Sequence, residues 1–569
     1  MSGTSGTDDA DIISLTETAT TSVAKMKYIT LNVPRQISAL PQVVEAADRH
    51  KLSSNAVNDV LAALIRDCGG DVDDFVLSKS TTLRMRRNVR LSQFESVRRS
   101  FKADIQGEFC TVHWDEKLLR EGDDLSAKEH IAILASYGDN VKLLGTSTLD
   151  SGTGMNQANA IKGILEDWDI EQSCLAMCFD TTASNTGKFI GACIVLEALL
   201  GNPLLWTACR HHMYEIVLGR VAREIFGTST GPKIELFDLL KKNWKNMDFE
   251  KETTHIVIGE NVCYEDVCMA KIHLDGLLNS KETYLPRDDY EELLKLCLVY
   301  IEKGSVDNFS FRRPGAHHRA RWMSSAIYAL KMILLQSQLE IDGETLMRLQ
   351  QFADFVACYY APNWFRCPLP ADASSLDLKF LKRLLVLGKS EGSMQNIAKV
   401  VVDTMRRHLW YLTEELVPFA LCSDKLHKEE KQRFALKLSE LVMKNLSEEL
   451  APQKPVFPNV TENTTLYDLL GYRSVLLFQR LKFTVEDLQF LRYPCDEWDK
   501  FPTYSRLRKV VKTLKVVNDV AERGVRCMEE YKDILTMDSE QRNLIMQCVE
   551  NTRKRYPDFK KSTLSKVKR

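Results

Sequence analysis

The chain has 569 residues, of which 44% are hydrophobic and 27% are charged, and its formal net charge is −2 at pH 7. This length predicts two or three domains, and the composition is that of a soluble globular protein. Because 76 Lys and Arg nearly balance 78 Asp and Glu, the overall charge neither indicates nor excludes a nucleic-acid partner. The apolar runs are too short to cross a bilayer, so we expect no membrane segment. The 15 cysteines form no CxxC pair, which favours reduced thiols and an intracellular compartment.

The N-terminal part of the sequence divides into a polar tail and a helical region. Residues 1–25 are rich in Ser, Thr, Gly and Asp and are predicted to be a disordered tail. Residues 26–105 are predicted to be helical, and they include a basic stretch that ends at Lys102. Such a stretch is as typical of a solvated helix face as of a surface that binds phosphate. Its candidate DNA-binding residues are Arg84, Arg86, Arg87, Arg90, Arg98 and Arg99.

Short apolar runs and helical patterns alternate in residues 106–220. Three strands are predicted first, at Phe109–Trp114, Ile131–Ser136 and Val141–Thr148. A helix, a strand, a helix and a strand follow, at Asn156–Trp168, Cys174–Phe179, Phe189–Leu200 and Leu204–Ala208. Three consecutive strands followed by this alternation are the order of an RNase H-like mixed sheet, not of a doubly wound one.

The remaining sequence is predicted to be helical. Residues 221–500 carry helical periodicity in segments such as Tyr290–Glu302 and Trp322–Leu335, and strand patterns are missing from most of the region. Residues 501–555 are also predicted to be helical, and residues 556–569 form a basic tail. The tail is typical of a nuclear-import signal or of a solvated chain end. The predicted fold class is therefore α/β plus all-α.

Asp180 is the most informative single residue of the sequence. It closes the apolar run Cys174–Phe179 and precedes the small polar stretch Thr181–Gly187, a pattern that delivers a carboxylate to the edge of a sheet. The alternative is that Asp180 caps the helix behind it. Asp115 ends an earlier predicted strand, and two carboxylates at neighbouring strand ends can bind hard cations through oxygen. With a third acid, such a site holds two metal ions for phosphoryl transfer.

A third acid cannot be selected by spacing, because exposed glutamates are common on helices. Here a resemblance selects it: the chain resembles the hAT family of DNA transposases at several motifs in the family's order. The matching residues are Asp180 with Ser184-Asn185, Cys209-Arg-His-His212, Arg321-Trp322 and Ala521-Glu522-Arg523. One departure is Gly524, which stands where the family commonly has a bulky residue.

The resemblance implies a metal-dependent DNA transposase. Its RNase H-like core would be interrupted by a helical insertion domain at residues 221–500 and completed by residues 501–555. Asp115, Asp180 and Glu522 would be the catalytic acids, holding Mg²⁺ or Mn²⁺ for cleavage of transposon ends and for strand transfer to target DNA. Trp322 would support the distorted DNA hairpin, with Arg321 on phosphate. Such an enzyme acts in the nucleus, and holding two ends together requires a homodimer or a larger homo-oligomer.

Several alternatives remain open from the sequence. Trp322 fits a helix core, because Met323, Ile327 and Leu330 continue an apolar stripe. Cys209 and His212 supply only two of the four ligands of a zinc site. A structural Cys and a buried His are therefore favoured, unless His212 helps to position the DNA strand as the resemblance implies.

Other features bear on cofactors and on activity. Asn185-Thr-Gly-Lys188 departs from a phosphate-binding loop on both sides, so we expect no nucleotide cofactor. The N-terminal zinc finger that is common in the family has no Cys and His spacing to form it here. The alternative function is therefore a transposase-derived, catalytically inactive module that binds DNA or other proteins.

Overall fold

The structure is a computed structural model of the whole chain, and its helices surround one small sheet. The residues it describes are 31–120, 127–227, 235–249, 258, 262–280, 285, 288–302, 309–314, 322–447, 454–532 and 538–556. Both predicted tails, except Tyr556, therefore lie outside the described residues. Two compact units are present: one comprises Met1–Ala47 and Leu52–Val89, and the other comprises Asp48–Lys51 and Arg90–Arg569. Among the described helices, none is long and apolar enough to cross a membrane.

The first unit contains α1 (Pro41–Arg49) up to Ala47, α2 (Ser54–Asp67) and the beginning of α3 (Lys79–Ile105). The Ser53 hydroxyl accepts a hydrogen bond from the Ala56 N–H (3.0 Å) and so caps the start of α2. The small apolar core of this first unit consists of Ile37, Ala47, Val57 and Leu61. The helices predicted before residue 105 are therefore present.

The sheet of the second unit has five strands in the order β3-β2-β1-β4-β5. Their bounds are β1 (Cys110–Arg120), β2 (Ala127–Tyr137), β3 (Asn140–Leu149), β4 (Cys174–Cys178) and β5 (Leu205–Trp206). The first three strands pair antiparallel, whereas β4 pairs parallel to β1 and β5 parallel to β4. Each of the five predicted strands is present, and the sheet is mixed, as its sequence order predicts.

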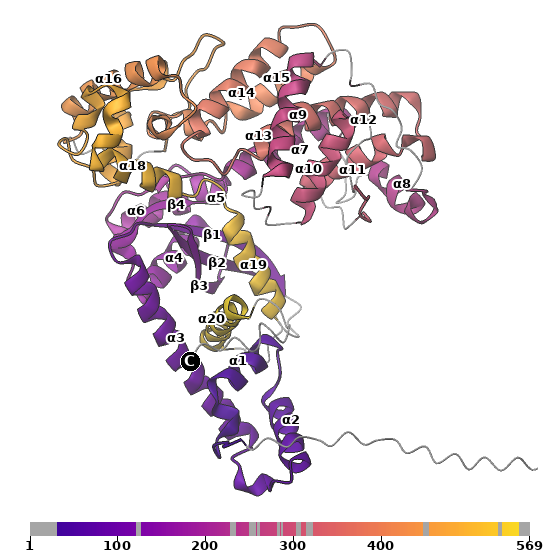
Figure 1. Cartoon of the computed structure of the whole chain (residues 1–569), viewed down its shortest axis with the longest axis vertical. Coiled ribbons are helices and arrows are strands. Elements are labelled where there is room, and N and C mark those ends of the chain that lie inside the picture. Colours follow the sequence, from indigo (N-terminus) through magenta and orange to yellow (C-terminus); the bar gives the residue numbers. More distant parts are fainter. Residues whose placement is uncertain are drawn as a thin grey trace, which may run out of the picture. The chain divides into compact units, whose positions relative to one another are not determined.

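Helices cover both faces of this sheet, because successive residues of a strand point to opposite faces. On β2, Ile131 and Ile133 belong to the core that includes α4 (Gly154–Trp168) and α6 (Ala192–Leu200). The alternate residues Ala132 and Leu134 belong to a second core with α19 (Asp519–Tyr531) and α20 (Ser539–Arg555). Figure 1 shows α4 and α19 on opposite sides of the strands. The C-terminal helices thus cover one face of a sheet whose strands lie almost 400 positions earlier in the chain. For example, the backbone N–H of Thr146 donates to the side-chain oxygen of Asn543, 397 positions later.

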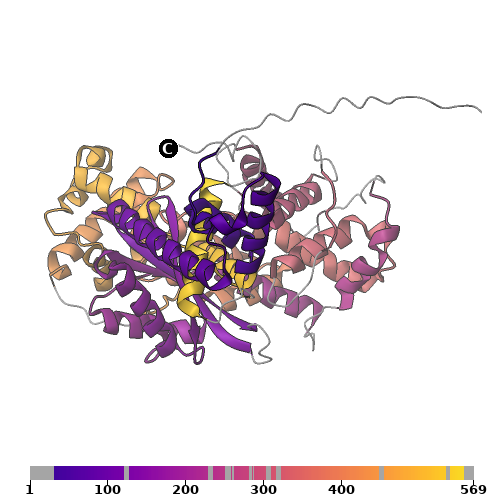
Figure 2. The ribbon, with the colours of Figure 1, turned by 90° about the horizontal axis from the view of Figure 1, so that it is seen from below.

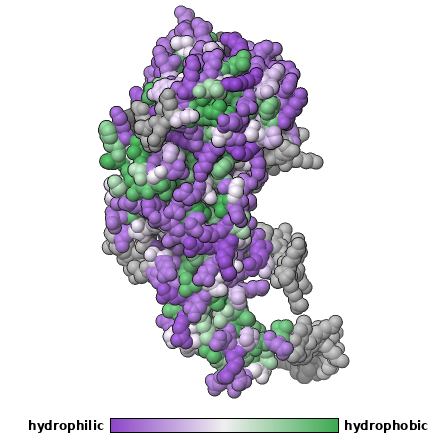
Figure 3. Space-filling view, turned by 90° about the vertical axis from the view of Figure 1, so that its left-hand side faces the viewer, coloured by the Kyte–Doolittle hydropathy of each residue, from purple (hydrophilic) through white to green (hydrophobic). Residues whose placement is uncertain are grey.

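A long helical region separates β5 from α19. Its helices are α7 (Arg210–Phe226), α8 (Glu235–Asn243), α9 (Tyr264–Asn279), α10 (Asp288–Ile301), α11 (Trp322–Leu334), α12 (Gly343–Phe355), α13 (Ala361–Trp364), α14 (Ala373–Leu387), α15 (Met394–Met405), α16 (Lys428–Asn445), α17 (Leu476–Arg480) and α18 (Pro502–Thr513). Figures 1 and 2 show α7 to α12 and α16 to α18 as two groups. The predicted domain boundary at residue 220 falls inside α7. The face shown in Figure 3 is mostly hydrophilic, and apolar residues gather there in small patches.

Candidate acid site at the ends of the central strands

Asp115 lies inside β1 and not at its end. The expectation that the strand ends at Trp114 was wrong, because β2 continues to pair with β1 as far as Arg120↔Ala127. The parallel partner β4 stops earlier, at His113↔Cys178. Asp115 therefore lies two residues beyond the last pair between β1 and β4. At this position, β1 is no longer paired with β4.

Asp180 and Asp115 project from the same face of the sheet. Asp115 follows His113 by two residues, and Asp180 follows Cys178, the partner of His113, by two residues. Because side chains alternate between faces, the two carboxylates share a face. Trp114 immediately precedes Asp115, and Phe179 immediately precedes Asp180. The two rings point to the other face of the sheet and stack there with centroids 5.5 Å apart. This buried aromatic pair fixes the two strand ends beside each other.

The loop after Asp180 does not use its carboxylate as a helix cap. The short helix α5 (Ala183–Thr186) follows Thr182, and no side chain caps it. Instead, the Asn185 amide donates to the backbone carbonyl of Asp180 (3.0 Å), and the Asn185 side-chain oxygen accepts from the Trp114 indole N–H (2.9 Å). The capping alternative for Asp180 is therefore wrong, and Asn185 ties the loop to β1.

Glu522 lies in the first turn of α19, the helix that covers the face carrying both aspartates. The side chain of Asn518, just before this helix, donates to the carbonyl oxygen of Trp114 (2.8 Å) and accepts from Nδ1 of His113 (3.2 Å). Gly524 brings α19 close to β2: a Cβ there would lie 2.9 Å from the Cβ of Ala132, the residue paired with Asp115. The departure from the family pattern at Gly524 thus has a packing reason.

The carboxylates of this site interact through their charges. Burial, followed by the charges of Asp180 and Glu522, raises the pKa of Asp115 to about 8. Burial, followed by the charges of Glu522 and Asp519, raises the pKa of Asp180 to about 7. Hard cations such as Mg²⁺ prefer carboxylate oxygens, and a bound cation would relieve this repulsion. Among the residues that the structure describes, no three or more His, Cys, Asp or Glu side chains are arranged so that they could hold a metal ion. The fit of these acids to a divalent cation rests on their carboxylate chemistry and on the face that the two aspartates share.

Asp519 is a further acid of the site that sequence reasoning missed. Its carboxylate lies 2.8 Å from Nδ1 of His211 and accepts a hydrogen bond from the hydroxyl of Tyr290 (3.3 Å). The His211 ring stacks on Trp364 with centroids 4.0 Å apart. Glu522 is three positions after Asp519, so both lie on one face of α19. That spacing was visible in the sequence, whereas the partners from α7 and α10 were not.

His212 and Cys209 flank the acids in different ways. Nδ1 of His212 lies 3.5 Å from Oδ2 of Asp180, and burial lowers the pKa of His212 to about 4, so the ring is neutral near pH 7. The sulfur of Cys209 is buried and accepts a hydrogen bond from the backbone N–H of Asn518 (3.1 Å). Cys209 is thus the buried cysteine that the sequence favoured, whereas His212 is half-buried, with 21% of its side chain exposed.

The candidate DNA contacts of the basic stretch fall into two groups. Arg84, Arg87 and Arg99 are exposed and Arg98 is half-buried. Arg86 and Arg90 are buried: Arg86 donates to the carbonyl of Leu52 (3.0 Å), and Arg90 forms a bidentate ion pair with Asp48 (2.7 and 2.8 Å). Arg86 and Arg90 therefore contribute to packing and do not form part of an exposed surface.

The insertion-region motif falls largely outside the described residues. Arg321 lies outside them, and Trp322 is described only as the first residue of α11, without its side chain. The next residues of the predicted apolar stripe, Met323, Ile327 and Leu330, are buried.

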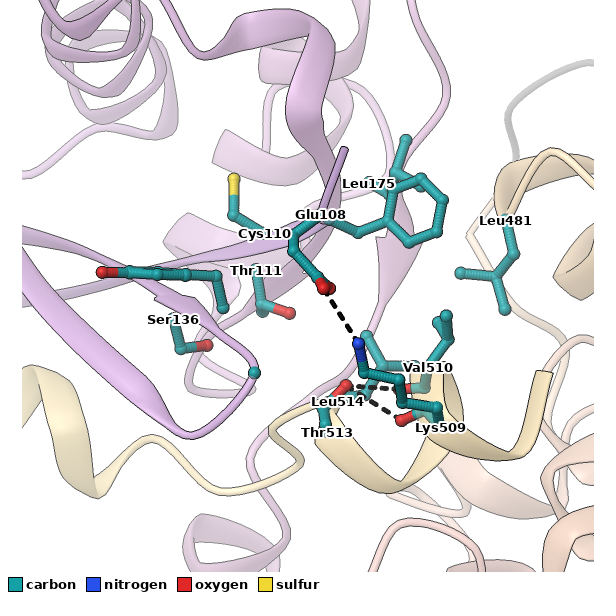
Figure 4. Close-up of a pocket in the computed structure, with 13 residues that line it drawn as sticks. Glu108, Cys110, Thr111, Ser136, Leu175, Leu481, Lys509, Val510, Thr513 and Leu514 are labelled. Carbon is teal, nitrogen blue, oxygen red and sulfur yellow. Dashed lines mark hydrogen bonds and ion pairs between the residues drawn. The ribbon is translucent and has the colours of Figure 1, made fainter. Parts of the chain in front are cut away.

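A separate pocket lies at the other end of β1. Figure 4 shows it between the start of β1 and α18, where Glu108 and Lys509 form an ion pair (2.9 Å). Thr111 and Ser136 also line it. Asp115 is four residues further along β1 than Thr111, about 13 Å in an extended strand, so the pocket is not part of the acid site.

No known protein-family model matches this sequence, and no curated protein matches it.

Proposed function

We propose that this chain is a divalent-metal-dependent DNA transposase similar to the hAT family. The observation that carries the proposal is that Asp115 and Asp180 share the face of the sheet that α19, with Glu522 in its first turn, covers. Burial first, and then neighbouring carboxylates that include Glu522, raise the pKa of each aspartate. Three acids from separate elements, one within β1, one just after β4 and one on α19, are a suitable donor set for phosphoryl transfer with metal ions.

An RNase H-like core is the fold that we propose for the sheet and its flanking helices. The strand order β3-β2-β1-β4-β5, with the first three strands antiparallel, supports this assignment. The helical region between β5 and α18 would be the insertion domain. The insertion explains why Glu522 can belong to the same site as Asp180 although 342 positions separate them.

In the proposed mechanism, Asp115, Asp180 and Glu522 would hold Mg²⁺ or Mn²⁺. When bound, the metal would supply activation of the attacking oxygen and charge stabilisation of the leaving one. Asn185 holds the Asp180 loop against Trp114, and Asn518 holds the start of α19 against the same residue. Neutral His212 beside Asp180 would position the DNA strand near the acids. These contacts orient the carboxylates before DNA arrives.

DNA would be the substrate, as the transposon ends and the target. Arg321 and Trp322 would contact the DNA near the cleavage site, and Arg84, Arg87, Arg98 and Arg99 are the available phosphate contacts of the basic stretch. Two ends must be held together, so the active form would be a homodimer or a larger homo-oligomer acting in the nucleus.

The test is metal-dependent cleavage by the purified full chain. The substrate is the DNA that flanks its reading frame, including any terminal inverted repeats, incubated with Mg²⁺ or Mn²⁺. We expect nicking or joining by the wild type and by Asp167→Asn, which changes an exposed acid on α4. Asp180→Asn should lose cleavage and keep DNA binding. A folded protein that binds these ends and never cuts them would instead support the inactive-module alternative.

A further inference from the structure

A tight turn just beyond Asp180 presents two large apolar side chains to solvent. The sequence pattern predicted a helix from Phe189, but α6 begins at Ala192 with Gly191 before it. Phe189 and Ile190 are instead 79% and 72% exposed, and Lys188 beside them is also exposed. We call residues 188–190 the apolar tip. Water solvates these exposed apolar side chains unfavourably, so a ligand that covers them gains free energy.

The apolar tip is held by closely packed backbone. The N–H of Gly191 donates to the carbonyl of Gly187 (3.1 Å), which closes the turn. A Cβ on Gly191 would lie 2.4 Å from the backbone nitrogen of Gly187, and a Cβ on Gly154 would lie 2.3 Å from the carbonyl oxygen of Ile190. Glycine is therefore required at both positions, and the side chains of the tip project from a rigid base.

The same turn belongs to the acid site through a short chain of contacts. Asn185, two residues before Gly187, donates to the carbonyl of Asp180 (3.0 Å). The Thr186 hydroxyl donates to the carbonyl of Thr182 (2.9 Å), within the same loop. The apolar tip is thus a continuation of the loop that begins at Asp180, a proposed metal ligand.

We propose that the apolar tip binds DNA beside the cleavage site, with Phe189 stacking on an unpaired or unstacked base. This inference rests on the proposed function for the presence of DNA at the acids. Apolar and aromatic side chains that insert at base steps are a general means of distorting a duplex, and every base offers a face for stacking. Lys188, whose ammonium lies 5.3 Å from the Phe189 ring centroid, supplies the charge that complements the neighbouring phosphate.

The experiment measures binding of the full chain to a 30-base-pair duplex with one unpaired 2-aminopurine at its centre, without divalent metal. We expect Phe189→Ala to weaken binding about fivefold or more, since stacking contributes about 1–3 kcal/mol per base, and to abolish the change in 2-aminopurine fluorescence. Phe189→Trp should retain both signals. Val386→Ala removes another exposed apolar side chain, 47% exposed on α14, and should leave both unchanged. Thermal unfolding checks that each variant folds.

The outcomes separate this inference from the proposed function. Equal binding and fluorescence for wild type and Phe189→Ala would overturn the role of the tip, whether or not the chain cuts DNA. Loss of both signals in Phe189→Ala supports it, even if the wild type never cleaves. If Phe189→Ala instead converts an oligomer to a monomer while the fluorescence response persists, the tip binds a second copy of the chain and the inference is wrong. A wild type that does not bind the probe also overturns it.

Discussion

The side-chain amide of Asn518 donates a hydrogen bond to the backbone carbonyl of Trp114 (2.8 Å). Trp114 immediately precedes Asp115 in β1, and Asn518 precedes Glu522 by four residues in the segment that starts α19. One bond therefore connects the strand of the first acid to the helix of the last. The same Asn518 side chain accepts from His113, which burial holds neutral with a pKa of about 3.

Asn518→Ala should destabilise the fold by about 1–3 kcal/mol, because it leaves the buried Trp114 carbonyl and His113 ring without this partner. Urea unfolding followed by circular dichroism measures the change. Asn445→Ala is the matched control, since its amide bonds only to the carbonyl of Leu441 within α16 (3.0 Å), and we expect a smaller loss. Equal losses in the two variants would show that the Asn518 contact has no special weight.

Gly524→Val should displace α19 and weaken the acid site. A Cβ at this position would lie 2.8 Å from Cδ1 of Leu134 and 2.9 Å from the Cβ of Ala132, and such overpacking costs about 1–3 kcal/mol. We expect lower stability together with weaker Mn²⁺ binding. Gly163→Ala, where a Cβ meets no heavy atom within 4 Å, should instead be neutral or stabilising by up to about 1 kcal/mol. Unchanged stability in Gly524→Val would contradict the close packing of α19 on β2.

The acids should make the metal-free protein less stable at higher pH. The pKa values of Asp115 and Asp180 are raised to about 8 and about 7, so the folded state holds these protons more tightly than the unfolded state does. Stability from this source is complete below about pH 4 and is lost as pH rises to about 8. His113 and His212, with lowered pKa values, act in the opposite direction below about pH 6.5.

The measurement that isolates the carboxylates is therefore thermal unfolding in EDTA between pH 6.5 and pH 8. Asp115 faces the charges of Asp180 and Glu522, with Lys117 as the nearby cation. Asp115→Asn removes the group whose pKa burial, Asp180 and Glu522 raise. We expect the wild type to lose more stability than this variant over the window. Parallel pH profiles would show that the acids do not repel one another.

Asp519→Asn should shift the pH dependence of metal binding without unfolding the site. The asparagine oxygen can still accept from Tyr290, but the charge that helps to raise the pKa of Asp180 is removed. Metal binding requires ionised ligands, so the pH of half-maximal Mn²⁺ binding should fall. Asp519→Ala should in addition destabilise the fold, because His211 loses its partner. An unchanged pH profile in Asp519→Asn would show that Asp519 does not act on Asp180.

The sequence predicted those parts of the site that depend on local pattern. The apolar run before Asp180 and the strand predicted before Asp115 placed the two acids at neighbouring strand ends. The two residues share a face of the sheet, although Asp115 lies inside β1. The length of β1 was not predicted, because it depends on pairing with β2. Asp519 was missed because its partners come from distant helices. Phe189 was predicted to lie in a helix because its apolar spacing continues into α6. The close backbone packing at Gly191 makes α6 begin at Ala192, so Phe189 lies outside the helix.

Which charged residues of the basic stretch are buried could not be predicted from the sequence either. Arg86 and Arg90 stand in the same basic run as Arg84 and Arg87, yet helical rotation turns the first pair into the protein and the second pair to solvent. A run of positive charges therefore predicted a phosphate surface more extensive than the exposed residues provide.

The most direct test of the central claim is equilibrium binding of Mn²⁺ to the full chain, followed by the loss of the free-ion electron paramagnetic resonance signal. The wild type and Asp167→Asn should bind Mn²⁺, and Asp115→Asn, Asp180→Asn and Glu522→Gln should each lose or strongly weaken that binding. A folded wild type that binds no Mn²⁺, or three acid variants that bind it as the wild type does, would contradict a shared metal site at these residues.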